Sequence, residues 1–106
     1  MLKQVRVPFD DIVFDPDEVG EMLTACMKRQ RKMCFVGAAA AEKCLIVLFE
    51  DSPVKSESQL VLAPFNSADP EEVSAEISQR FERNYLLRAT FRIQSKFWAL
   101  YEVEEA

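Results

Sequence analysis

The chain has 106 residues, of which 49% are apolar and 29% charged, and its formal net charge is −5. A chain of this size forms one domain, residues 1–106, that buries roughly 65% of the surface exposed in its unfolded state. The acidic balance argues against nonspecific nucleic-acid binding, which needs a surplus of lysine and arginine. No apolar run reaches the roughly 18 residues of a membrane span, and the N-terminus lacks the apolar block of a signal peptide, so we expect a cytoplasmic protein with no membrane partner.

Residue types on which most enzymes depend are scarce. There is no histidine, which removes the commonest general base at neutral pH and most zinc and iron sites. The two glycines, Gly20 and Gly37, cannot build a glycine-rich phosphate loop. The three cysteines, Cys26, Cys34 and Cys44, lack Cys-x-x-Cys spacing and stand among apolar residues, so we interpret them as reduced core residues. We therefore expect no enzymatic activity, no cofactor and no metal site.

Two similar helix start signals organise the chain. Asp15-Pro16-Asp17-Glu18-Val19 begins one helix and Asp69-Pro70-Glu71-Glu72-Val73 begins another. In each, the aspartate accepts a bond from a first-turn backbone N–H, and the proline has no N–H to leave unpaired. Capping explains these carboxylates better than a two-carboxylate catalytic mechanism does. Phe14 and Val19 also have the spacing of a hydrophobic staple.

Apolar periodicity predicts six strands and two helices. The expected elements are a strand over 4–9, a helix from 16 to about 32, strands over 33–41 and 44–50, a linker over 51–58, a strand over 59–65, a helix from 70 to about 84, and strands over 85–94 and 97–103. A turn at Glu42-Lys43 closes the first hairpin. A three-residue turn at 94–96 closes the second, because that register puts the apolar residues of both strands on one face.

The order strand-helix-strand-strand occurs twice, over residues 1–52 and 58–106. Leu48-Phe49-Glu50 aligns with Leu100-Tyr101-Glu102. The sequence therefore predicts an α+β fold built by a tandem β-α-β-β duplication. Its expected form is an antiparallel sheet of about six strands with the two helices packed on one face.

The face without helices should be polar if water covers it, and the sequence makes it partly apolar. The first hairpin is apolar on both sides, and two helices cannot cover both faces of so wide a sheet. A second protein chain, either another copy or a different protein, is the simplest cover; the alternative is a sheet that curls to bury its own middle. The candidate partner-binding residues on this face are Val36, Ile46, Leu48, Arg92, Trp98 and Leu100.

The same register places Arg92 opposite Trp98 and Arg88 opposite Glu102. The first pair suits a cation–π contact and the second a cross-strand ion pair. A further candidate feature is the run of small residues Gly37, Ala38 and Ala40, which leaves room for a ligand groove or for close packing. Such a groove would take a cationic small molecule if it held an acidic residue such as Glu42, Glu50 or Glu102.

In the order of its elements, the tandem β-α-β-β pattern resembles GyrI-like effector-binding domains. That resemblance implies a groove for small, often cationic ligands. Without the first strand, the order α-β-β-β-α-β-β is similar to that of type III secretion chaperones and their relatives, which implies a small acidic dimer that binds partner polypeptides. Neither resemblance includes a residue motif, so neither assigns a role to any residue.

From the sequence, the expected function is a non-enzymatic protein-binding or dimerisation module that uses the helix-free sheet face. A small-molecule effector-binding domain is the alternative.

Overall fold

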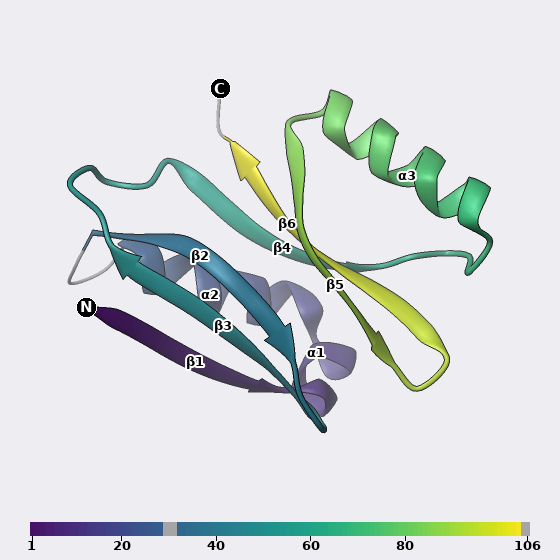
Figure 1. Ribbon diagram of the computed structural model, residues 1–106, viewed down its shortest axis with the longest axis horizontal. Coiled ribbons are helices and arrows are strands. Elements are labelled where there is room, and N and C mark those ends of the chain that lie inside the picture. The colour runs from purple at the N-terminus through teal and green to yellow at the C-terminus, as the bar shows by residue number, and fades with distance from the viewer. Residues whose placement is uncertain (29–31, 105–106) are drawn as a thin grey trace.

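The computed structural model describes residues 1–28 and 32–104, and over these it contains two three-stranded antiparallel sheets and three helices (Figure 1). In chain order the elements are β1 (Leu2–Pro8), α1 (Phe9–Phe14), α2 (Pro16–Lys28), β2 (Met33–Ala40), β3 (Cys44–Asp51), β4 (Ser58–Pro64), α3 (Pro70–Glu82), β5 (Tyr85–Ile93) and β6 (Lys96–Glu104). Sheet A has the strand order β1-β3-β2, and sheet B has the order β4-β6-β5.

The expected α+β class is confirmed, but the single six-stranded sheet is wrong. Each half of the chain runs strand, helix, strand, strand, and its last strand lies in the middle of its sheet. Only the first half contains the additional short helix α1. The strand register is irregular between Phe35 and Gly37 in β2, and between Leu87 and Ala89 in β5. These two bulges face the aligned segments of β3 and β6, so the two halves share their strand order and an irregularity in the same strand.

We expected both long helices on one face of a common sheet, and this expectation is wrong. Figure 1 shows α1 and α2 behind sheet A, and α3 on its own beside sheet B. Val19, Leu23 and Met27 of α2 join one large buried cluster with residues of both sheets, here called the main core. A second, smaller cluster joins Val73 and Ile77 of α3 to the other face of sheet B. Sheet B therefore has buried apolar residues on both faces, one packed against the first half of the chain and the other, in part, against α3.

Burial on both faces of sheet B explains why the predicted turn of the second hairpin is wrong. The turn has two residues, Gln94 and Ser95, and Gln94 has a positive φ of 57°. Phe91 consequently pairs with Trp98, and Arg92 pairs with Phe97. This register divides the apolar residues between the two faces of the sheet. The three-residue turn would suit a hairpin with one buried face, whereas sheet B buries apolar residues on both faces.

The predicted helix starts are confirmed. The Asp15 Oδ1 atom accepts the backbone N–H of Glu18 at 3.1 Å, and the Asp69 Oδ2 atom accepts that of Glu72 at 3.3 Å. The predicted staple is wrong, because Phe14 is 89% exposed. The expected continuation of the first helix to residue 32 includes 29–31, which lie outside the described residues.

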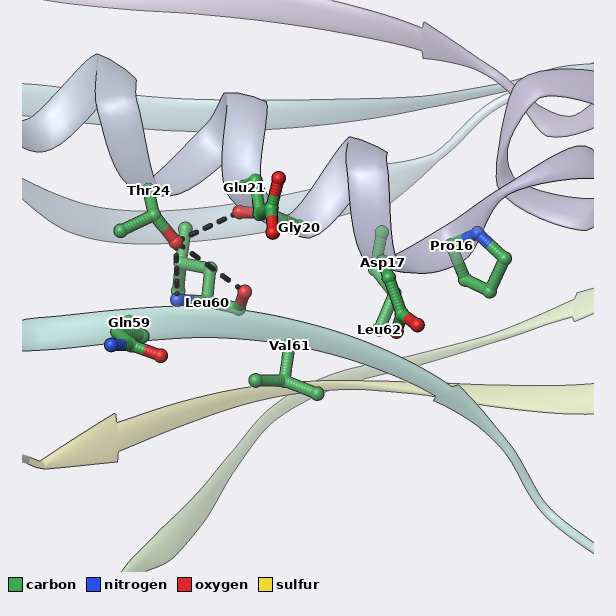
Figure 2. A pocket seen from close by; sticks show the side chains of 9 residues that line it. All are labelled: Pro16, Asp17, Gly20, Glu21, Thr24, Gln59, Leu60, Val61 and Leu62. Carbon is green, nitrogen blue, oxygen red and sulfur yellow. Dashed lines mark hydrogen bonds between the residues drawn. The ribbon is translucent and has the colours of Figure 1, made fainter.

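The two halves meet most closely where α2 crosses β4, an edge strand of sheet B. A Cβ atom added to Gly20 would lie 2.8 Å from the backbone oxygen of Leu60. One turn later, the Thr24 hydroxyl accepts the Leu60 N–H at 2.9 Å and donates to the Gly20 carbonyl at 2.8 Å (Figure 2). The helix can therefore approach the strand only because residue 20 has no side chain.

Gly20→Ala is expected to destabilise the fold by about 1–3 kcal/mol, because the new methyl group meets backbone and not a flexible side chain. Gly37→Ala is the matched control. Its Cβ would meet nothing within 4 Å and its φ is not positive, so this variant should be as stable as the parent or about 0.5 kcal/mol more stable. Urea unfolding of both variants measures the difference. Equal stabilities would show that the contact between Gly20 and Leu60 is not tight.

Candidate functional site

The surface that most needs an explanation is the side of sheet A that faces away from α1 and α2, here called the outer face of sheet A. Along β3, Leu45, Val47 and Phe49 are buried in the main core, so the alternate residues point to the opposite side. The strand register then defines the members of the outer face: Leu2, Gln4, Arg6 and Pro8 of β1, Cys44, Ile46, Leu48 and Glu50 of β3, and Cys34, Val36, Gly37 and Ala39 of β2.

Three of the six predicted partner-binding residues belong to this face. Ile46 and Leu48 occupy its centre and are half-buried by their neighbours. Val36 is the extra residue of the bulge in β2 and is 50% exposed. Because of the bulge, Phe35 packs against the main core and does not share a face with Gly37.

The other three predicted residues are not brought together with them. Trp98 is 5% exposed and Leu100 is 0% exposed, and both belong to the main core under the first half of the chain. The expectation that they lie on an uncovered face is therefore wrong. Arg92 is exposed, but it pairs with Phe97 and so lies on the opposite side of sheet B from Trp98. The predicted cation–π contact between Arg92 and Trp98 is wrong for the same reason.

The predicted ion pair between Arg88 and Glu102 is confirmed. Both the Nε and the Nη2 atoms of Arg88 lie 2.8 Å from the Glu102 Oε1 atom. The expected core position of all three cysteines is only partly correct: Cys26 packs against the main core, whereas Cys34 is exposed and Cys44 is half-buried on the outer face of sheet A.

The alternative ligand groove is not formed as predicted. Gly37 pairs with Leu48 on the outer face, whereas Ala38 packs against the main core on the other side. Ala40 pairs with Leu45, so it shares the side of Ala38. The three small residues therefore do not line one groove. Ala38 and Ala40 lie on the core side of β2, and Gly37 leaves a shallow depression on the outer face.

A groove of about 430 Å³ lies instead between α2 and β4 (Figure 2). It is lined by Pro16, Asp17, Gly20, Glu21, Thr24, Gln59, Leu60, Val61 and Leu62. The Thr24 hydroxyl is already engaged with the backbone of Leu60 and Gly20. The polar group at the base of the groove thus holds the two halves together.

The main polar feature that the sequence analysis missed lies under α3. The Tyr101 side chain is fully buried, and its hydroxyl has no hydrogen-bond partner among the described residues. The Arg80 guanidinium lies over the rings of Tyr85 and Tyr101, at 5.1 and 5.2 Å from their centroids. Burial raises the pKa of Tyr101, and the positive charge of Arg80 opposes that rise. A phenol with a raised pKa stays protonated at neutral pH and does not act as a base there.

Within residues 1–28 and 32–104, no three histidine, cysteine, aspartate or glutamate side chains are grouped so that they could hold a metal ion. No helix in the same ranges has both the length and the hydropathy to cross a membrane. Comparisons with protein-family models, with curated proteins and with solved structures find no match.

Tyr101→Phe is expected to be as stable as the parent, or up to about 2 kcal/mol more stable, because it removes a buried hydroxyl that has no partner. The pKa of Tyr101 is raised in the folded state, so its contribution to stability is complete below pH 10 and is lost as the pH rises above that value. The variant should lose less stability than the parent on titration above pH 10. Thermal unfolding at pH 7 and in alkaline buffer measures both effects; a clear loss at pH 7 would mean that the hydroxyl has a partner.

Proposed function

We propose that this protein is a non-enzymatic association module that pairs with a second copy of itself through the outer face of sheet A. The observation that supports the proposal is that two equivalent faces differ in how far the chain itself buries them. Ile46 and Leu48 align with Trp98 and Leu100, which lie at the corresponding positions of sheet B. In sheet B both of these positions are buried, whereas no part of the described chain covers them in sheet A.

The composition of the outer face supports association with another chain. Its centre is apolar, and the residues of β2 beside that centre, Gly37 and Ala39, are small. A Cβ at Gly37 would meet no atom within 4 Å, so a partner can approach the backbone closely at this position. Contiguous apolar surface of this kind marks association sites when it is not covered by the chain itself.

The charges on this face favour a second copy as the partner. The chain carries a net charge of −5, yet the face has one cation, Arg6, and one anion, Glu50. Arg6 pairs with Ile46, and Glu50 lies four residues beyond Ile46 on β3, about 13 Å away. The two charges thus lie at opposite ends of the apolar centre. A twofold axis running across the strands exchanges these ends and brings Arg6 close to Glu50 of the partner subunit.

The test blocks the face without removing any core group. Gly37→Arg adds a long charged side chain that points into open space, and it should convert the dimer into a monomer in sedimentation equilibrium. Gly37→Ala is the control and should leave the dimer intact. Both variants should keep the thermal stability of the isolated fold. A parent protein that sediments as a monomer at high micromolar concentration would contradict the proposal, as would a Gly37→Arg variant that still dimerises.

Arg6 and Glu50 provide a second test by charge reversal. Arg6→Glu alone should weaken the dimer, because it places two like charges together across the twofold axis. Adding Glu50→Arg should restore association, because the exchanged pair is again complementary. Failure of the double variant to recover affinity would argue against this arrangement of the two copies.

A further inference from the structure

A second uncovered apolar surface lies at the corner where α1 meets α2. Val13 and Phe14 end α1, and Met22 lies two turns into α2; all three are exposed, with Phe14 at 89%. We call these three residues the corner patch. A groove of about 340 Å³ adjoins it, lined by Asp11, Phe14, Asp15, Glu18, Val19 and Met22. The corner therefore combines an exposed aromatic ring with a hollow beside it.

The corner is well anchored, so the exposure of Phe14 is a property of the folded chain. Ile12 of α1 is fully buried in the main core. Phe9, at the start of α1, stacks on Phe91 of β5 with ring centroids 5.8 Å apart and an interplanar angle of 9°. These two residues fix both the position and the orientation of α1. They hold Phe14 on the side of the helix that faces solvent.

Comparison of the two halves shows that the repeated unit does not require α1. In the second half, the chain passes from β4 to α3 without an additional helix. The first half has the same strand order and an equivalent bulge, but it inserts α1 before α2. The insertion adds Ile12 to the core, and it also adds the two most exposed residues of the corner patch, which contribute little to that core.

The segment of chain that builds the corner carries charge of one sign. Residues 7–27 contain six carboxylates and no lysine or arginine, so this segment alone is more negative than the chain as a whole, whose net charge is −5. The six are Asp10, Asp11, Asp15, Asp17, Glu18 and Glu21. Of these, the Asp15 Oδ1 atom accepts the Glu18 N–H as a helix cap. Asp11, Asp15 and Glu18 line the groove beside Phe14, and we call these three the acidic rim; Asp17 and Glu21 line the separate groove between α2 and β4.

We propose that the corner patch and its acidic rim bind a basic segment of another protein, one that presents a large apolar side chain between lysines or arginines. The apolar side chain would enter the groove beside Phe14, and the cations would lie against the carboxylates. Exposed aromatic residues next to a pocket are typical centres of binding energy, and a complementary rim of charge adds specificity and association rate. The rim also repels anionic lipid surfaces, so its charge selects a basic polypeptide over a membrane.

This site is separate from the dimer face. The corner lies on the helix side of sheet A, and the outer face lies on the other side (Figure 1). A dimer formed through the outer face would thus present two corners to the solvent. The inference does not depend on dimerisation, because a monomer carries the same corner.

The experiment uses a fluorescent amphipathic peptide in which leucines spaced three to four residues apart are flanked by lysines. Two further peptides are the probes for specificity: one with glutamate in place of every lysine, and one with serine in place of every leucine. The full chain should bind the first peptide in fluorescence anisotropy and should bind neither of the others. Raising the salt from 50 mM to 500 mM should weaken binding by about tenfold, because the rim is exposed.

Phe14→Ser should weaken the binding of the first peptide by about tenfold or more. Phe81→Ser is the matched control, since Phe81 is also a largely exposed phenylalanine (63%) but lies on α3, beside sheet B. It should bind as the parent does. Because the Phe14 side chain is exposed, both variants should unfold at the parental temperature. Double neutralisation by Asp11→Asn and Glu18→Gln should weaken binding and reduce its salt dependence.

Three results would each overturn the proposal. The first is no binding of the lysine–leucine peptide at 100 µM concentration of the protein. The second is equal binding by the Phe14→Ser and Phe81→Ser variants, which would place the peptide elsewhere. The third is equal binding of the glutamate-substituted peptide, which would mean that the acidic rim does not choose the partner. None of these outcomes bears on the oligomeric state, so failure here leaves the dimer proposal intact.

Discussion

The contact between Gly20 and Leu60 is the constraint from which the arrangement of the molecule follows. β4 is an edge strand, and an edge strand exposes unpaired backbone groups that need a partner. The Thr24 hydroxyl takes the Leu60 N–H, and the missing side chain at Gly20 lets the helix lie against the strand. α2 thereby protects the edge of sheet B while its apolar stripe fills the main core. One helix thus supplies the closest contact between the two halves.

The asymmetry between the two sheets has its origin in this contact. Because α2 draws the first half across sheet B, Trp98 and Leu100 become core residues of the second sheet. No second copy of that contact exists within the described part of the chain, so the equivalent positions Ile46 and Leu48 remain on an outer surface. When two halves of the same strand order pack once, one on the other, one of the two equivalent faces is left without cover. That is the physical basis for placing an association surface on sheet A and not on sheet B.

The sequence was sufficient for the two helix starts, for the six strands and for the α+β class, but not for α1, for the turn of the second hairpin or for the packing of the two halves. Helix starts depend on short-range chemistry, so Asp15 and Asp69 identified them correctly. The double apolar character of the first hairpin was also recognised. The prediction that an apolar face must be an uncovered face was wrong. Trp98 was expected to be exposed because a single six-stranded sheet was expected. The predicted register of the second hairpin was wrong for a related reason. A positive φ at Gln94 has no strong sequence signal, and apolar residues are buried on both faces of this hairpin.

Phe14 illustrates the opposite error, in which a local rule predicted packing that the fold does not use. Its spacing from Val19 suits a staple, yet Phe9 and Ile12 orient α1 so that Phe14 points outward. A fold that needed only to stabilise this corner would bury the aromatic ring or replace it with a polar residue, because exposed phenylalanine adds aggregation risk without stability. Six carboxylates and no cation along the same stretch reduce that risk for identical copies, which repel each other there, while they attract a basic partner. The charges that keep two corners apart thus also favour a basic partner there, and they are consistent with our proposal that two copies pair through the nearly neutral outer face of sheet A.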